Sequence, residues 1–381
     1  MEKIKIILGI TIVLFSLAGC NSSNQEKVDN INQVVKIGAV FPLTGDIAEY
    51  GNYWKQGLEL AIDDATNSGL IKKDQVNLFV EDGKANPTNS LSAFTKLISL
   101  HNIQVCFSAT SGVTLALKPT ANEKRIILMN ASAISTEIEN KPDFLFSVIP
   151  NANYTGNYLA ETAFNKLQKQ KAGILYRNDA SGKSFHDVFK QHFTELGGQI
   201  VYEDAHPINN TDFQSYILKI KNAPNIDVLF VASWGPEVSH FVKEAKENNL
   251  NIQVLAYETF KSPKSLEIAG DAANGVIFSS PKLIEIENQN EDLKFKKEVK
   301  QKFNHEEINY HILGHYDAMM IILNAISKGN FTSEQLKKYL EEMQEYKGVT
   351  GDIKFDTNGG VILPLGLYTV KDKQFVKLIL N

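Results

Sequence analysis

The stretch VKIGAVFPLTGDIAEYGNYWKQGLELAIDDAT, residues 35–66, decides the fold. It opens with an almost continuous apolar run of strand length, Val35–Phe41, and then crosses a short loop that contains proline and glycine. It continues into an amphipathic run of helix length, which we expect at Tyr53–Asn67. A strand without polar alternation is typical of a parallel sheet that helices cover on both faces.

The same alternation of strand and helix continues along the chain. Short β-rich runs lie at 35–41, 76–82, 103–109, 125–130, 172–178, 199–204, 227–233, 253–258 and 275–280. Amphipathic stretches of helix length lie at 53–67, 90–100, 114–123, 154–167, 184–196, 212–221 and 236–248. This order predicts a doubly wound α/β protein.

The alternation is too long for one sheet, and it restarts near Ile149-Pro150. No low-complexity linker marks that point, so we expect two lobes joined by short crossovers. Helices at 314–329 and 332–343, followed by strand and hairpin material at 351–360 and 365–380, are predicted as closing elements shared between the lobes. The predicted lobes are 34–152 plus 282–350, and 153–281 plus 351–381.

The first residues predict export. Lys3 and Lys5 precede an apolar run, Ile6–Phe15, which is too short for a membrane span of about 20 residues. The ending Leu-Ala-Gly-Cys is similar to a bacterial lipobox, so residues 1–19 are predicted to be a lipoprotein signal and Cys20 the lipidated residue. An ordinary secretory signal cut nearby is the alternative. The polar segment 20–33 is predicted to be a flexible tether, and the protein to be extracytoplasmic and anchored to a bacterial membrane.

Composition excludes several classes of function. The net charge is −5 with no basic block, which argues against nucleic acid as a partner. After export the chain would keep one cysteine, Cys106, inside an apolar strand, where a buried small side chain is expected. A single thiol forms no internal disulfide and no zinc site.

Enzyme motifs are incomplete in this chain. Ser181–Ser184, Ser-Gly-Lys-Ser, resembles the end of a P-loop, but Arg177 stands where the first glycine belongs. His311 and His315 have helical i, i+4 spacing, without a third ligand in the pattern. We therefore expect no nucleotide, no metal, no other cofactor and no catalysis.

Polar residues follow most of the predicted strands, where a doubly wound sheet binds its ligands. Ser111 at a helix start, together with Ser135, suits a carboxylate, because hydroxyls and free N–H groups at helix N-termini bind anions. Glu258 is a lone acid after an apolar strand and suits an ammonium group, while Tyr50 and Trp234 suit a carbon skeleton. Each residue alone is as readily an ordinary loop or core residue, and only their combination favours a binding site.

Four segments resemble the leucine/isoleucine/valine-binding proteins of ABC importers: residues 35–66, SATSGVTLALKPTANEKRIILMNASAIS (108–135), DVLFVASWGPE (227–237) and GDIKFDTNGG (351–360). The resemblance covers nearly the whole predicted mature chain. It implies the type I periplasmic-binding-protein fold, with two Rossmann-like lobes that have parallel-sheet cores and are joined by three crossovers. It also implies a ligand trapped by hinge closure, and a permease and an ATPase as partners.

The resemblance implies a role for each matching position. These positions are Ser111, Gly112, Ala133 and Ser135 for the ligand carboxylate, Glu258 for the ammonium group, Trp234 for an aromatic contact and Tyr50 for the side-chain pocket. The departure is Ser181, where the family commonly has tyrosine. Either the pocket is larger there, or the contact comes from Arg177, Asp179 or a water molecule.

Three functions remain open on the sequence. The first is the receptor of an importer for a branched-chain or similar amino acid. The second is a sensing receptor for an amide, a short acid or an aromatic compound, without transport. The third, an enzyme on a related scaffold, is disfavoured by the incomplete motifs, and Glu258 counts mildly against simple organic acids.

Overall fold

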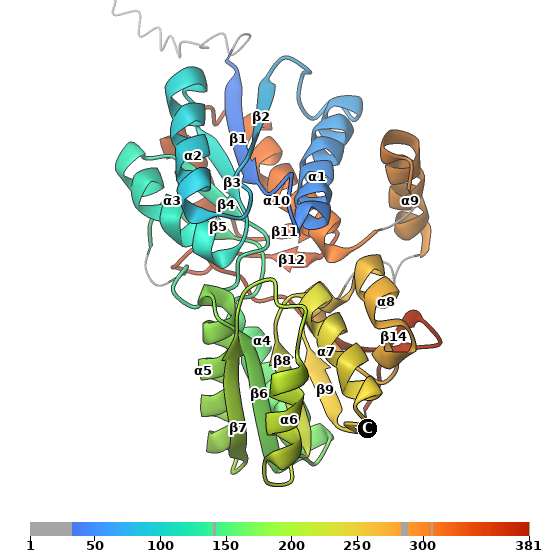
Figure 1. Ribbon diagram of the computed structural model, residues 1–381. Coiled ribbons are helices and arrows are strands. Elements are labelled where there is room, and N and C mark those ends of the chain that lie inside the picture. Colours follow the sequence, from blue (N-terminus) through green and yellow to red (C-terminus); the bar gives the residue numbers. More distant parts are fainter. Residues whose placement is uncertain (1–32, 140–141, 283–288, 306–307, 381) are drawn as a thin grey trace, which may run out of the picture. The chain divides into compact units, whose positions relative to one another are not determined.

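Two α/β lobes with parallel-sheet cores organise the described chain (Figure 1). The computed structural model describes residues 33–139, 142–282, 289–305 and 308–380. The predicted signal at 1–19, the lipidation site Cys20 and the tether up to residue 32 lie outside the described residues. None of the described helices is long and apolar enough to cross a membrane.

The first sheet has the strand order β2-β1-β3-β4-β5, and all of its described neighbours pair in parallel. Its strands are β1 (Val35–Phe41), β2 (Val76–Asp82), β3 (Val105–Ser108), β4 (Ile127–Asn130) and β5 (Leu145–Ser147). The helices of this part are α1 (Ala48–Asn67), α2 (Pro87–His101), α3 (Ser111–Lys124), α9 (Gln289–Phe303), α10 (Tyr310–Ser327) and α11 (Ser333–Glu342).

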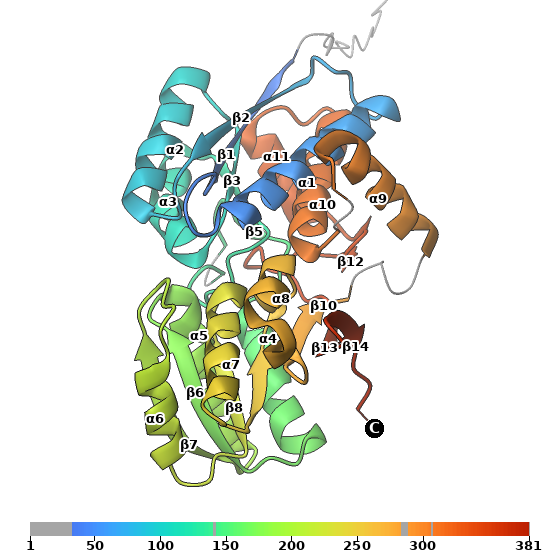
Figure 2. The ribbon, with the colours of Figure 1, turned by 45° about the vertical axis from the view of Figure 1, so that its right-hand side comes forward.

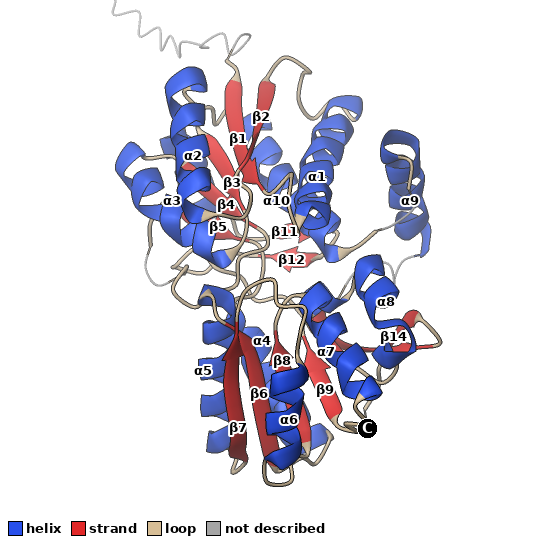
Figure 3. Ribbon diagram, in the orientation of Figure 1, coloured by secondary structure: helices blue, strands red, loops and turns tan. Residues whose placement is uncertain are grey.

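Helices bury both faces of this sheet, which explains its nearly continuous apolar strands (Figure 3). Ile37 of β1 packs in the hydrophobic cluster that contains Trp54 of α1 and Met319 of α10. Val40 of the same strand packs in the cluster formed with α2 and α3, which also contains Cys106. Cys106 is fully buried, as predicted, and its burial raises the pKa of the thiol.

The second sheet has the order β14-β13-β10-β9-β8-β6-β7, with β13 and β14 antiparallel to their neighbours and the remaining pairs parallel. Its strands are β6 (Lys171–Arg177), β7 (Gln199–His206), β8 (Val228–Ala232), β9 (Gln253–Ala256), β10 (Ile277–Pro281), β13 (Leu365–Lys371) and β14 (Gln374–Lys377). The α-helices of this part are α4 (Ala152–Glu161), α5 (Ala180–Glu195), α6 (Gln214–Asn222), α7 (Gly235–Glu247) and α8 (Pro263–Ala269). A π-helical turn follows α4 at Thr162–Lys166, and 3-10 turns lie at Glu258–Phe260 and Gly270–Ala273.

The chain passes between the two lobes three times within the described order of elements. It leaves the first sheet after β5, leaves the second after β10, and returns to the second before β13 (Figure 2). Before this last passage, a hairpin of β11 (Tyr346–Gly348) and β12 (Gly351–Ile353) is tied to α10. There the carboxylate of Asp317 accepts bonds from the backbone N–H groups of Val349 (2.9 Å) and Thr350 (2.8 Å).

Candidate functional site

Loops that follow strand ends in both sheets line a cavity of about 210 Å³. From the first lobe it is lined by Ile47, Ala85, Pro87, Thr110, Ser111, Gly112, Ser132 and Ile134. From the second lobe it is lined by Arg177, Asn178, Asp179, Ser181, Ile208, Trp234, Tyr257, Glu258 and Thr259. Carboxyl ends of parallel strands are where doubly wound folds bind their ligands, so the cavity lies at the expected place.

Glu258 brings an unpaired carboxyl group to this cavity. It directly follows Tyr257 at the end of β9 and is 6% exposed. Within the described residues its carboxylate bonds to no other side chain, and burial raises its pKa to about 7. Its own backbone N–H is a hydrogen-bond partner, but a buried carboxylate without a cation is costly, so this position favours a ligand that brings a positive charge.

The start of α3 offers hydrogen-bond donors that suit a negatively charged group. The hydroxyl oxygen of Ser111 accepts the N–H groups of Ile134 and Ser135, each at 3.1 Å, so its own proton is available for donation. No side chain of the described chain caps this helix, which leaves its first N–H groups open to an anion. The preceding Thr110 has φ 64°, a strained backbone of the kind that accumulates at functional sites.

Three predicted site residues lie behind the lining instead of in it. The N–H of Ala133 donates to Oδ1 of Asn130 at 2.7 Å, so it is not free to hold a carboxylate in this arrangement. The hydroxyl of Ser135 lies 3.1 Å from the hydroxyl of Ser184, a residue of α5 in the other lobe. Tyr50 donates its hydroxyl to the carbonyl of Thr259 at 2.9 Å. These residues support the cavity wall and the contact between the lobes.

The start of α5 explains the fragment of a P-loop. Oδ1 of Asp179 accepts the N–H of Gly182 at 2.8 Å and the hydroxyl of Ser181 at 2.7 Å, so the anion at this helix start is part of the protein. Gly182 is needed for packing, because a Cβ atom there would lie 2.0 Å from the carbonyl oxygen of Arg177. Nothing in this geometry favours a bound phosphate.

Arg177 and Trp234 form the second-lobe wall of the cavity. Nη1 of Arg177 donates to Oε1 of Glu237 at 3.2 Å, and Nε lies 2.8 Å from Oδ2 of Asp179. The guanidinium carbon lies 5.8 Å from the centre of the Trp234 ring, close enough for a cation–π contact. Trp234 in turn meets the ring of Tyr50 at 5.1 Å.

His311 and His315 belong to an aromatic cluster of the first lobe. Nε1 of Trp54 donates to Nδ1 of His311 at 3.4 Å, and the ring of His315 stacks on Trp54 with centroids 5.6 Å apart. Burial lowers the pKa of each histidine to about 3. No group of three or more potential metal ligands occurs in the part of the chain that the structure describes.

The cavity lining contains five of the eight predicted ligand contacts: Ser111, Gly112, Ser181, Trp234 and Glu258. It also contains residues that were not predicted, among them Ser132, whose hydroxyl is buried without a hydrogen bond to the described residues. Tyr257 and Thr259 flank Glu258 and are also part of the wall. Their adjacency to the same strand ends was the sequence signal that could have identified them.

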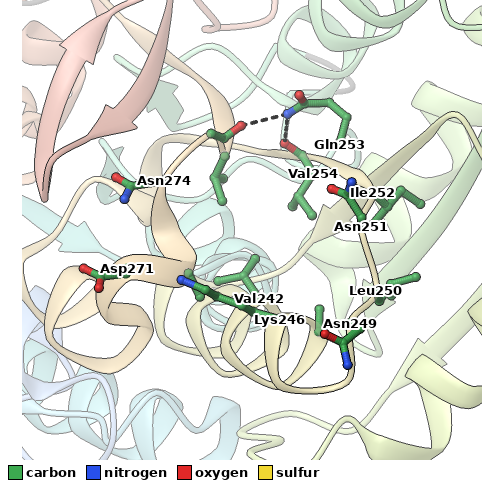
Figure 4. Close-up of a pocket in the computed structure, with 14 residues that line it drawn as sticks. Val242, Lys246, Asn249, Leu250, Asn251, Ile252, Gln253, Val254, Asp271 and Asn274 are labelled. Atoms are coloured by element: carbon green, nitrogen blue, oxygen red, sulfur yellow. Dashed lines mark hydrogen bonds between the residues drawn. The ribbon is translucent and has the colours of Figure 1, made fainter.

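A larger hollow of about 550 Å³ lies at the opposite end of the second sheet, where β9 and β10 begin (Figure 4). None of the predicted ligand contacts lines it. The amide of Gln253 donates to the carbonyls of Val254 (3.0 Å) and Gly275 (2.9 Å), so it is engaged within the protein. The smaller cavity is therefore the candidate ligand site, because it contains a buried carboxyl group without a cationic partner among the described residues.

Comparison with solved structures identifies the fold. A branched-chain amino acid transporter substrate-binding protein of Streptococcus pneumoniae, solved with isoleucine, matches with a TM-score of 0.82 at 23% identity over 91% of this chain and 100% of that one. A solute-binding protein of an ABC transporter of R. palustris, solved with benzoate, matches with a TM-score of 0.81 at 20% identity over 91% and 96%. The predicted type I periplasmic-binding-protein fold is thereby confirmed.

Sequence comparison gives the same result. A leucine-, isoleucine-, valine-, threonine- and alanine-binding protein of Pseudomonas aeruginosa is 21% identical over 327 residues, which are 85% of this chain and 86% of the relative. The sequence model described as periplasmic binding protein matches residues 34–374. The chain therefore belongs to the periplasmic binding protein family.

Proposed function

We propose that this protein is the solute-binding receptor of an ABC importer and captures an amino acid in the cavity between its lobes. The proposal rests on one observation: a cavity of about 210 Å³ contains both an acidic group, which suits a cation, and hydrogen-bond donors, which suit an anion. Glu258 offers a buried carboxylate for an ammonium group, and Ser111 with the start of α3 offers donors for a carboxylate. An α-amino acid carries both groups on adjacent atoms.

The relatives support this ligand class. One is named for binding leucine, isoleucine, valine, threonine and alanine, and another was solved with isoleucine. The chain belongs to the periplasmic binding protein family, and these relatives are named for, or solved with, a bound amino acid. The proposed role is therefore capture and delivery, without a chemical step.

The proposed setting follows from the sequence at the N-terminus. An export signal at 1–19 and lipidation at Cys20 would hold the receptor outside the cytoplasm on a bacterial membrane. A permease and an ATPase would be its partners. The lobe bounds 34–152 plus 282–350 and 153–281 plus 351–381 remain part of this proposal.

A second candidate is a sensing receptor for an aromatic acid. One structural relative was solved with benzoate, and Trp234 and Tyr257 in the lining offer aromatic surface. Glu258 argues against it, since an aromatic acid has no cation for that carboxylate.

A thermal-shift and calorimetry panel of the twenty amino acids, short amides and benzoate on the purified protein tests the proposal. A ligand at 100 times its Kd should stabilise the fold by about 2.7 kcal/mol. We expect at least one amino acid to give saturable binding. Binding of benzoate without binding of any amino acid would favour the second candidate. Uptake of the labelled ligand by cells with and without the protein separates transport from sensing.

A further inference from the structure

We propose that Arg177 makes this site selective for a neutral amino acid whose short side chain carries a hydrogen-bond acceptor, a hydroxyl or an amide oxygen. Branched aliphatic and acidic amino acids would bind more weakly. The inference rests on the proposed capture of an amino acid and goes beyond it by naming the class of side chain.

Part of the Arg177 guanidinium forms no hydrogen bond within the described chain. The residue is 8% exposed and lines the cavity. Nη1 donates to Glu237, and Nε is buried 2.8 Å from Oδ2 of Asp179, so both of these nitrogens face carboxylates of the protein. Nη2 has no hydrogen bond to any described residue. A guanidinium has five N–H donors, and leaving them unmet in a closed site is unfavourable.

Two carboxylates already surround Arg177. Asp179 and Glu237 both flank the guanidinium, so one positive charge already faces two negative ones. A ligand carboxylate would add a third negative charge to this group, which is repulsive. An aliphatic side chain would leave the donors unmet. A neutral oxygen satisfies them without adding charge.

Arginine is a rare residue type in this chain. The chain has 39 lysines and arginines, yet only Arg125 and Arg177 are arginines. Arg125 is exposed, and its side chain pairs with Glu334 and lies over the ring of Phe144. At position 177 the planar guanidinium contacts two carboxylates and lies 5.8 Å from the centre of the Trp234 ring, and a lysine ammonium cannot reproduce both contacts equally well.

The size of the cavity limits the length of the side chain. Its volume of about 210 Å³ is below the roughly 300–1,000 Å³ that is usual for ligand pockets. Serine, threonine and asparagine carry their oxygen one or two bonds beyond Cβ at most. The class of side chain selected by Arg177 is therefore expected to be short as well.

Matched pairs of amino acids test the selectivity on the full-length protein by calorimetry. Threonine has a hydroxyl where valine has a methyl group. Asparagine has an amide where leucine has two methyl groups. Asparagine and aspartate differ in charge. We expect the neutral polar member of each pair to bind about 10- to 100-fold more tightly, the cost of buried donors left unmet. Valine or leucine binding as tightly as its polar partner would overturn the selectivity and leave the proposed function intact. Failure of every amino acid to bind would overturn both.

Variants assign the preference to Arg177. Arg177→Met removes the donors, and we expect threonine and valine to bind with similar affinity; Arg125→Met is the matched control and should keep the preference. Because Arg177→Met also leaves Asp179 and Glu237 without their cation, Arg177→Lys provides a variant that keeps the charge. We expect Arg177→Lys to reduce the ratio of the threonine affinity to the valine affinity. An unchanged ratio in both variants would overturn the assignment. If Arg177→Met does not fold, an unchanged ratio in Arg177→Lys alone would overturn it.

Discussion

At the scale of single residues, the site depends on a carboxyl group that the fold does not neutralise. Glu258 is almost fully buried, and burial raises its pKa to about 7 from an ordinary value of 4.5. In the ligand-free protein, the neutral form therefore stabilises the fold at low pH, and this contribution is lost as the pH rises through about 7. An ammonium group at this position reverses the balance by favouring the charged form.

This coupling predicts pH-dependent affinity. Binding of an amino acid should lower the pKa of Glu258 and release a proton, so affinity should fall by up to about tenfold for each pH unit below about pH 7. Glu258→Gln should abolish this dependence and weaken binding by roughly 2–5 kcal/mol at pH 8. Calorimetry in buffers of different ionisation enthalpy measures both the affinity and the released proton.

The control for this experiment is a second carboxyl group with a similar titration. The pKa of Glu139 is also raised to about 7, chiefly by burial, but Glu139 does not line the cavity. Glu139→Gln should therefore keep the pH dependence of binding. If Glu258→Gln binds the ligand with the wild-type pH profile, Glu258 is not the partner of the ammonium group.

At the scale of elements, the alternation of apolar strands and amphipathic helices was enough to predict the sheets, and errors arose where packing overrode local pattern. Helix α1 begins at Ala48, earlier than the predicted Tyr53, because Gly51 looked like a loop residue. In the structure that glycine lets the helix lie against the carbonyl of Pro42, where a Cβ would come within 1.9 Å. The strand β5 (Leu145–Ser147) was missed because three residues carry no periodicity.

The site shows a similar division between what sequence could and could not predict. Ser111 and Glu258 lie two or three residues after the ends of β3 and β9, so position along the chain was informative. The contact of Arg177 with Glu237 joins residues 60 positions apart, and only the parallel pairing of β6 with β8 brings them together. No local pattern encodes such a pair.

Close packing at the start of α5 gives a prediction at this scale. Gly182→Ala should destabilise the protein by about 1–3 kcal/mol, because the added methyl meets backbone of β6 that cannot move without disturbing the sheet. Gly112→Ala at the start of α3 is the matched control, since its nearest neighbour would be 3.8 Å away. Urea unfolding of the two variants measures the difference, and equal stabilities would contradict the packing argument.

At the scale of the whole described unit, hydrogen bonds hold the two lobes together around the cavity. Tyr50 reaches Thr259 in the interior, and at the margin Nδ2 of Asn209 donates to Oδ2 of Asp46 at 2.7 Å. Asp46 and Asn209 line a neighbouring hollow of about 240 Å³ that shares Arg177 with the ligand cavity. The backbone N–H of Asn209 donates to Glu237 at 2.6 Å, so the residue that receives Arg177 also positions this contact.

The contact between Asp46 and Asn209 is therefore expected to slow the escape of a bound ligand. Asn209 has φ 59°, so Asn209→Gly removes the side chain while keeping a backbone conformation that glycine tolerates. We expect the dissociation rate to rise about 2- to 10-fold, the effect of one exposed hydrogen bond to a charged group, with a smaller change in the association rate. Stopped-flow tryptophan fluorescence, to which Trp234 in the cavity lining contributes, follows the dissociation. Asn210→Gly is the control, because the Asn210 amide donates to Asp212 within the same loop and should leave the rate unchanged. A dissociation rate that does not differ between Asn209→Gly and Asn210→Gly would show that closure depends on the buried contacts alone.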